Sequence, residues 1–327
     1  GIASNGNGVA VWVEKGSIVA KARSAEGGRD PLPATLSNSG MASSPYVVMD
    51  VNGNATAVWI DHGVITASSL PLKGTWTPKT TLSSTEASSL SLAVDLEGNV
   101  IAVWIRGDNV ESATQLVGKS WPKTPDVIES VGAALPAIAI GEGGDAVVVW
   151  HAVAGVNHAI YASAKPVNGS WAMPEMLSDE MLNCVNAHVA VGSQGQAVAV
   201  WYRVDESGLY YSPVFVLAAE RSAAGIWGIP EVLSSQGLQA SIGLIARAAY
   251  DHQGNALAVW CISFDGSVFN LQSSVKQVGN AWSSVASPVA LNLYAFDFDL
   301  AIAQGDAFMA LVAFDNAYQS LQVLVVE

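Results

Sequence analysis

The heptapeptide GNATAVW at residues 53–59 recurs along this chain, and its recurrence limits the folds that the chain can adopt. Near copies read GNVIAVW at residues 98–104 and GNALAVW at residues 254–260. Successive copies lie 45 to 59 residues apart, and the tryptophan positions are Trp12, Trp59, Trp104, Trp150, Trp201 and Trp260. A seventh copy, GDAFMALVAF, has Phe314 in place of tryptophan. Such a chain repeats one supersecondary unit, and neighbouring units must stack to bury a core that no unit can bury alone.

Each unit contains four short runs with the composition of β-strands. An alternating apolar run such as SLSLAVD comes first, then a Gly- and Asn-rich turn such as DLEGN, then the AVW run. A third run such as VESAT and a closing segment such as MPEMLS complete the unit. No helical period extends beyond one turn. The pattern predicts four antiparallel strands, with the first two joined as a tight hairpin.

Four-stranded units at this spacing are typical of β-propeller blades. Seven copies of the second strand predict an all-β fold, a seven-bladed β-propeller of four-stranded antiparallel blades, with residues 1–327 as a single domain. A six-bladed ring with a remnant is the alternative. The chain begins near the end of a first strand and stops after a third strand, so either one blade joins the two termini or one blade is incomplete.

Two tryptophan series have different expected roles. In the AVW series, strand alternation places Ala57 and Trp59 on one sheet face and Val58 on the other, so the indole can pack on the small residue of a neighbouring blade. A second series precedes the closing segments and comprises Trp76, Trp121, Trp171, Trp227 and Trp282. We favour packing for this series too. The alternative is sugar stacking, with one shallow pocket per blade.

The turn pattern Asp-x-x-Gly-Asn could suggest a calcium loop. It lacks the carboxylates at alternate positions that such loops use, so we expect a structural turn, no metal site and no cofactor. Two cysteines, Cys184 and Cys261, have no metal-type or redox-type spacing and are expected to be buried free thiols.

Composition excludes several functional classes. The net charge of −14 comes from 28 acidic and 14 basic residues, without the cationic cluster that nucleic-acid binding requires. No apolar run reaches the roughly 18–20 residues that span a bilayer, so membrane insertion is not expected. We expect a monomer that is extracellular, on the cell surface or periplasmic in a bacterium.

The hairpin LAVDLEGNVIAVW at residues 92–104 resembles the hairpin of NHL-type propeller repeats. The segment WAMPEMLS at residues 171–178 has a W-x-x-P-x-x-L-S pattern that is similar to sialidase-like bacterial propellers. The chain departs from NHL repeats by placing Trp where they carry Asp, and it lacks the Ser-x-Asp-x-Gly-x-x-Trp box of sialidases. The resemblance implies the fold and no particular activity.

The copies stop agreeing just beyond each AVW run, in the loops that join the second and third strands. Variable polar loops on a uniform scaffold are a common place for binding residues. The candidate ligand-binding residues on these loops are Asp61, His62, Arg106, His151, Arg203, Asp205, Asp265 and Asp315. With His158 nearby, the histidines could serve as bases or metal ligands, although isolated histidines at strand ends are more often structural.

No established catalytic motif occurs in the sequence. The sequence therefore favours a non-enzymatic binding module that recognises a protein or glycan through the loop face around the central channel. Two alternatives stay open. One is a multivalent lectin that uses tryptophan pockets between blades, and the other is a glycoside hydrolase or lyase with carboxylates at the channel mouth, where a hydrolase needs two carboxylates about 5–10 Å apart.

Overall fold

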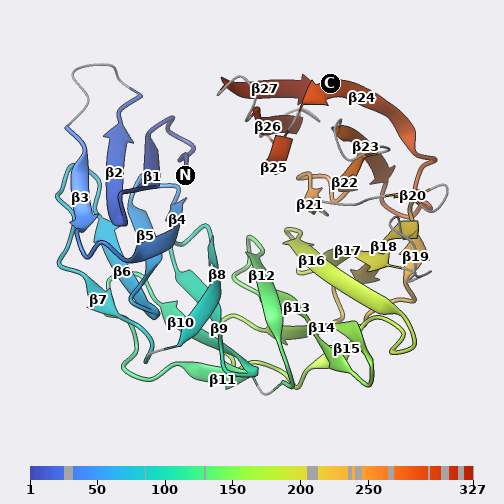
Figure 1. Cartoon of the computed structure of the whole chain (residues 1–327), viewed down its shortest axis with the longest axis horizontal. Helices are drawn as coiled ribbons and strands as arrows, with labels where there is room; N and C mark the ends of the chain where they lie inside the picture. The colour runs from blue at the N-terminus through green and yellow to red at the C-terminus, as the bar shows by residue number, and fades with distance from the viewer. Residues whose placement is uncertain are drawn as a thin grey trace. The chain divides into compact units, whose positions relative to one another are not determined.

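All regular structure in the described residues is β-strand, as a computed structural model of the chain shows (Figure 1). The structure describes residues 1–25, 32–84, 86–128, 130–204, 213–234, 238–239, 245–263, 269–293, 295–302, 309–315 and 320–326. The chain divides into two compact units, one formed by residues 1–144 and 166–174 and the other by residues 145–165 and 175–327. No helix in the described part is long and apolar enough to cross a membrane.

The first unit contains strands β1 to β12. Their bounds are β1 Gly8–Glu14, β2 Ser17–Arg23, β3 Ala34–Ser37, β4 Ala42–Met49, β5 Ala55–Asp61, β6 Val64–Leu70, β7 Thr80–Thr81, β8 Ala87–Val94, β9 Val100–Arg106, β10 Asn109–Gln115, β11 Asp126–Ile128 and β12 Ala134–Ile140. Sheets in this unit have the orders β1-β2-β3, β4-β5-β6-β7 and β8-β9-β10-β11, and their strand pairs are antiparallel.

The second unit contains strands β13 to β27. Their bounds are β13 Ala146–Ala154, β14 Asn157–Lys165, β15 Glu175–Met176, β16 Asn183–Val191, β17 Ala197–Val204, β18 Pro213–Arg221, β19 Glu231–Val232, β20 Leu238–Gln239, β21 Ala246–Tyr250, β22 Ala256–Ser263, β23 Phe269–Lys276, β24 Ala286–Leu293, β25 Ala295–Ile302, β26 Met309–Asp315 and β27 Ser320–Val326. Sheets here include β16-β17-β18-β19, with β20 also paired to β18, then β21-β22-β23-β24 and β25-β26-β27.

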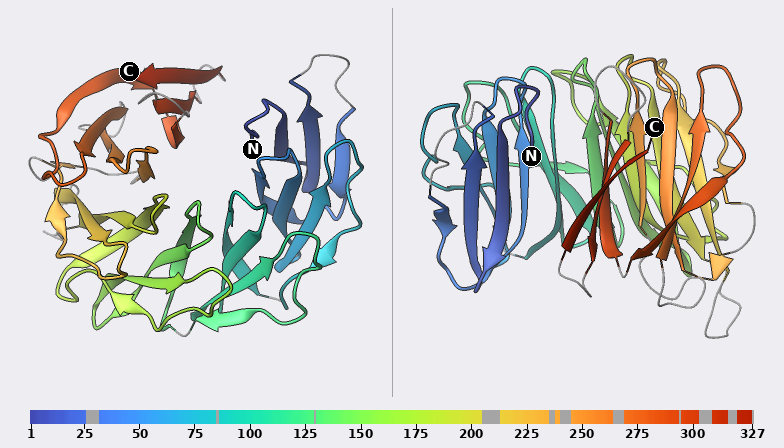
Figure 2. Two further views of the ribbon diagram at one scale, coloured as in Figure 1. Left: turned by 180° about the vertical axis from the view of Figure 1, so that it is seen from behind. Right: turned by 90° about the horizontal axis from the view of Figure 1, so that it is seen from above.

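The predicted all-β class and the four-stranded antiparallel unit are confirmed. Consecutive strands lie side by side within each sheet, and the fourth strand is often only two residues long, as in β7 and β15 (Figure 2). The number of blades stays a prediction.

Five of the six tryptophans of the AVW series lie in the buried cores, whereas Trp12 is half-buried. Trp59, Trp104, Trp150, Trp201 and Trp260 are each 0% exposed. In the first unit, Trp104 of β9 shares a buried cluster with Val58 and Ile65 of the preceding sheet, whereas Trp59 packs with Ile18 one sheet earlier. The opposite directions of Trp59 and Val58 confirm the alternation expected from the sequence.

The Asp-x-x-Gly-Asn turn is held together by its own side chains. In one copy, Asn99 donates its backbone N–H to Asp95 Oδ1 and its side-chain N–H to Asp95 Oδ2, both at 2.7 Å. The Asn99 Oδ1 atom accepts the N–H of Val117 at 3.0 Å, and Gly98 adopts a φ of 93°. Because both carboxylate oxygens accept hydrogen bonds within the turn, the expected structural role is confirmed. The turns at residues 50–54 and 251–255 repeat these bonds.

We expect the Trp59→Ala substitution to lower the free energy of unfolding by about 3–5 kcal/mol, because it leaves a large cavity between two sheets. Chemical denaturation monitored by circular dichroism would measure this loss. Met173→Ala is a suitable control, since Met173 is 87% exposed and its truncation should change stability by less than about 0.5 kcal/mol. A loss below about 1 kcal/mol for Trp59→Ala would contradict the packing account.

Candidate functional site

Asp61 and His62 lie where β5 turns into β6. Asp61 pairs with Val64, so His62 and Gly63 are the two central residues of a tight hairpin. Both have positive φ angles, 55° for His62 and 73° for Gly63, as the favoured two-residue turns of hairpins require. The turn between β1 and β2 has the same geometry, with Lys15 and Gly16 at φ angles of 51° and 72°, so the conformation of His62 belongs to the turn type.

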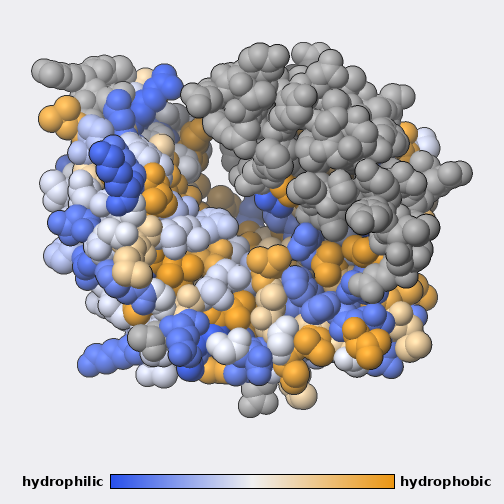
Figure 3. Space-filling model, in the orientation of Figure 1, coloured by the Kyte–Doolittle hydropathy of each residue, from blue (hydrophilic) through white to orange (hydrophobic). Residues whose placement is uncertain are grey.

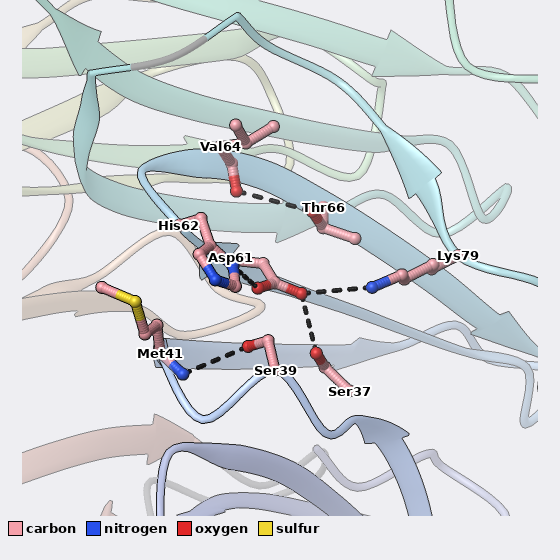
Figure 4. Close-up of polar contacts among 8 residues, drawn as sticks. All are labelled: Ser37, Ser39, Met41, Asp61, His62, Val64, Thr66 and Lys79. Atoms are coloured by element: carbon pink, nitrogen blue, oxygen red, sulfur yellow. Dashed lines mark hydrogen bonds and ion pairs between the residues drawn. The ribbon is translucent and has the colours of Figure 1, made fainter.

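The carboxylate of Asp61 is the centre of a polar cluster (Figure 4). Its side chain is 7% exposed. Oδ2 accepts a hydrogen bond from Ser37 Oγ at 2.7 Å and lies 3.3 Å from Lys79 Nζ, while Oδ1 lies 2.7 Å from His62 Nδ1. Ser37 belongs to the preceding sheet, so the carboxylate also links two sheets of the first unit.

These contacts set the protonation state of Asp61. Burial alone would raise its pKa, but hydrogen bonds from Ser37, Ser39, His62 and Lys79 stabilise the charged form, and the net result is a pKa well below the ordinary value of an aspartic acid. Asp61 is therefore a carboxylate at neutral pH and cannot serve as a general acid.

The pairing with Asp61 leaves His62 equipped as a base. When Nδ1 donates its proton to Asp61, Nε2 carries the lone pair of the neutral ring. The His62 side chain is 54% exposed, so Nε2 can be reached from solvent. A carboxylate that orients a histidine and stabilises its cation is the arrangement by which many enzymes prepare a general base.

Arg106 lies at the same end of the neighbouring sheet. Backbone contacts connect the His62 turn to Arg106. The Ala87 N–H donates to Gly63 O, next to His62, at 2.9 Å, and Ala87 is the cross-strand partner of Arg106 in the β8-β9 pair. The guanidinium is 44% exposed.

Glu111 holds the Arg106 side chain in place. Arg106 Nε donates to Glu111 Oε1 at 2.6 Å, and the pairing raises the pKa of Arg106. Glu111 is 1% exposed and also accepts the indole N–H of Trp104 at 2.9 Å. Arg106 is therefore tied by a buried carboxylate to the core tryptophan of its own repeat.

Among the predicted residues of the second unit, the structure describes the side chains of His151 and Arg203, and each has its own contacts. His151 and His158 meet edge to face with ring centroids 5.4 Å apart, and His158 Nδ1 lies 3.3 Å from Asn183 Oδ1. Burial, with a smaller effect of His158, lowers the pKa of His151 to about 4, so this ring is neutral at pH 7. Arg203 lies over the ring of Phe215, 4.0 Å from its centroid.

Three predicted carboxylates cannot be placed. Asp205 and Asp265 lie outside the described residues, and Asp315 ends β26, where only the backbone is described. Their binding roles stay predictions.

The second tryptophan series packs against the sheets. Trp121 is 8% exposed within a core cluster, and Trp76 and Trp282 lie against other clusters. Trp171 donates its indole N–H to the buried Ser112 Oγ at 2.7 Å, and Trp227 is half-buried. These contacts agree with the favoured packing role, and sugar stacking by this series stays a prediction.

Sequence reasoning did not identify Ser37, Lys79 and Glu111. Glu111 carried a usable signal, since among the four runs VITAS, VESAT, AIYAS and LQSSV only VESAT contains an acidic residue. Ser37 and Lys79 had none, because they reach Asp61 from segments 24 and 18 residues away. Within the described residues, no group of three or more His, Cys, Asp or Glu side chains could hold a metal ion.

Both cysteines are buried free thiols, as predicted. Burial raises the pKa of Cys184, and it raises that of Cys261 to about 12. Neither thiol is therefore prepared as a nucleophile.

The sequence matches no known protein-family model and no curated protein. Solved structures share the fold. A polysaccharide lyase, Uly1, aligns with a TM-score of 0.62 and 6% identity over 99% of this chain and 88% of its own. A polysaccharide lyase of family PL25, an ulvan lyase bound to -[GlcA(1-4)Rha3S]-, aligns with a TM-score of 0.61 and 11% identity over 99% and 90%. A Hadza microbial sialidase aligns with a TM-score of 0.52 and 14% identity over 95% and 73%.

These structural matches support the predicted resemblance to β-propellers and to sialidase-like propellers. The resemblance to NHL-type repeats stays a prediction. The matches also correct the functional interpretation. The three solved structures named above are carbohydrate-active enzymes, so the preference for a non-enzymatic binding module is wrong. The alternative of a glycoside hydrolase or lyase agrees better with this finding.

The Asp61 cluster makes a prediction about stability and pH. The pKa of Asp61 is lowered on folding, so its carboxylate contributes stability that is complete above about pH 4 and is lost as the pH falls below that value. We expect the Asp61→Asn variant to lose less stability than the wild type when the pH is lowered through this range. Thermal unfolding at a series of pH values would measure the difference.

Asp108→Asn provides the matched control, because Asp108 is an exposed carboxylate and its replacement makes the same change in charge. Identical acid sensitivity of the wild type and Asp61→Asn would contradict the assignment of Asp61 as an ionised, hydrogen-bonded group.

Proposed function

We propose that this chain cleaves an acidic polysaccharide by β-elimination, with His62 as the general base. The observation that carries the proposal is the pairing of the exposed His62 with the buried carboxylate of Asp61 at 2.7 Å. The likeness of the fold to polysaccharide lyases supports it, and one of those lyases binds a saccharide that contains GlcA, a uronic acid.

The reaction needs a base and a cation. His62 Nε2 takes the proton from the sugar carbon next to the uronate carboxylate. The electron pair of that C–H bond forms a carbon–carbon double bond, and the bond to the glycosidic oxygen breaks. The His62 imidazolium gives its proton to the leaving oxygen, so the base is regenerated and no water is added across the bond. Negative charge builds up on the carboxylate during the step and must be stabilised by a nearby cation.

Lys79 and Arg106 are the candidates for that cation. Their side chains are 56% and 44% exposed, and both are anchored by carboxylates, Lys79 by Asp61 and Arg106 by Glu111. Each can contact a substrate carboxylate with the hydrogen-bond donors that its protein partner does not use.

The ionised state of Asp61 agrees better with an elimination reaction than with glycoside hydrolysis. A glycoside hydrolase requires a carboxylic acid that keeps its proton until it donates it to the leaving oxygen, and its pKa is raised for that purpose. The pKa of Asp61 is lowered, and Ser37, His62 and Lys79 contact its oxygens. The role left to Asp61 is to orient His62 and to stabilise the imidazolium after proton transfer.

The number of blades, the oligomeric state and the location of the protein are also part of the proposal. Seven copies of the second-strand pattern support a seven-bladed propeller, with six blades as the alternative. The acidic composition and the sialidase-like repeats support a monomeric, extracellular, cell-surface or periplasmic bacterial protein with a carbohydrate ligand.

The His62→Ala variant should lose at least about a hundredfold in cleavage rate, the contribution typical of a positioned general base. The assay follows the ultraviolet absorbance of the unsaturated product from a glucuronate-containing polysaccharide. His252→Ala is the control, since His252 is exposed in the turn between β21 and β22. New reducing ends without that absorbance would indicate hydrolysis and contradict the elimination, as would full activity of His62→Ala.

A further inference from the structure

A cavity of about 430 Å³ opens in the second unit, in a different part of the repeat from the His62 turn. It is lined by the turns that join β16 to β17 and β21 to β22 and by the segments that follow β18 and β23. His62, in contrast, occupies a turn between a second and a third strand. The volume falls within the range of about 300–1,000 Å³ that is typical of ligand pockets.

Four amide side chains give this cavity its polar lining. They are Gln194, Gln196, Gln253 and Gln277. Amides both donate and accept hydrogen bonds, which suits the hydroxyl groups of a sugar. The half-buried Tyr250 adds a phenol whose pKa is raised by burial and by Glu220, so it is protonated and can donate as well. Two largely exposed apolar side chains, Ile226 and Val278, offer contact surface for the C–H groups of a sugar ring.

The two cationic side chains in the cavity wall differ in their ion pairs. Lys276 Nζ lies 2.7 Å from Glu220 Oε1 and 3.5 Å from Glu231 Oε1, so its charge is compensated twice. Arg221 makes no ion pair with any described residue. Its only described hydrogen bond is a long one from NH1 to Gly195 O at 3.4 Å, and its buried Nε finds no partner among the described atoms.

The local backbone makes room for this guanidinium. Gly225 has a φ of 89°, and a Cβ added there would lie 2.9 Å from Arg221 NH2. Corresponding strand positions in other sheets carry Leu70, Gln115, Lys165 and Lys276. The first sheet has a guanidinium at this position too, but Arg23 is exposed, whereas Arg221 is half-buried. The Arg221 side chain is half-buried, and its buried Nε–H carries an energetic cost as long as no acceptor pairs with it.

We propose that this cavity binds a sugar unit bearing an anionic group, a carboxylate or a sulfate, with Arg221 as the residue that recognises the charge. The planar guanidinium fork matches such oxyanions, and the surrounding amides bind the ring hydroxyls. In its choice of an acidic polysaccharide as the ligand, the inference rests on the proposed function.

Hydropathy over the face in Figure 3 gives no competing docking surface. Hydrophobic residues are scattered among hydrophilic ones over the described residues of that face. A cavity with one uncompensated cation in its wall therefore carries the stronger case for a ligand.

The test uses the full-length chain with His62→Ala, so that cleavage does not consume the ligand. Isothermal titration calorimetry compares an oligoglucuronate, a sulfated neutral oligosaccharide and the unsulfated neutral oligosaccharide of the same length. Arg221→Gln should weaken binding of the anionic ligands by tenfold or more, roughly the loss of one charge-assisted contact. Gln253→Ala, at the exposed rim, should weaken them to a smaller extent.

Lys165→Gln is the matched control, because Lys165 holds the corresponding position of another sheet and does not line the cavity. Circular dichroism and thermal unfolding establish that each variant is folded. Preference for the oligoglucuronate or for the sulfated ligand would identify the anionic group.

Equal binding of the neutral oligosaccharide, no binding by any ligand, or binding unchanged by Arg221→Gln would overturn this site. Cleavage is measured separately with the wild type. Arg221-dependent binding without cleavage would overturn the proposed function and leave the site standing, whereas cleavage without Arg221-dependent binding would do the reverse.

Discussion

Packing of a tryptophan from one sheet against small and branched residues of its neighbour is the interaction on which the rest of this structure depends. Trp104 packs on Val58 and Ile65, and Trp260 packs with Val200 and Val216 in the other unit. A single four-stranded antiparallel sheet of this size has two faces to cover, so neither face can stay dry without a neighbour. The repeated AVW run supplies both the indole ring of one sheet and the valine on the next sheet against which that ring packs. The turns and loops are attached to the ends of these buried strands.

The same packing explains why polar and charged side chains gather just beyond the AVW run. Asp61 follows Trp59 by two residues and therefore lies on the same sheet face, at the edge of the core. There its carboxylate is buried enough to be held by Ser37, yet close enough to the surface to orient the exposed His62. Arg106 takes the same place after Trp104, and Glu111 connects it to that indole. In these two repeats, the candidate site residues are thus attached directly to a buried core tryptophan or to its strand.

The sequence allowed the strand pattern, the tight turns and the burial of the first tryptophan series to be predicted, because these depend on local periodicity. It also marked His62 and Asp61 as a place where the copies diverge. It could not predict that they pair, nor that Ser37 and Lys79 complete the cluster, since those contacts arise from sheet-to-sheet packing. The choice of a binding module was wrong for a related reason. It rested on the lack of a catalytic motif, and a dyad of two adjacent residues has no distinctive spacing.

Whether Asp61 and His62 act as one catalytic unit is the central claim, and a double-mutant cycle tests it most directly. Cleavage rates of Asp61→Asn, His62→Ala and the double variant would be compared with the wild type, each after confirmation that the variant is folded. If Asp61 acts through His62, Asp61→Asn lowers the rate and the double variant stays within about twofold of His62→Ala alone. Losses that multiply in the double variant, or full activity of Asp61→Asn, would contradict the account.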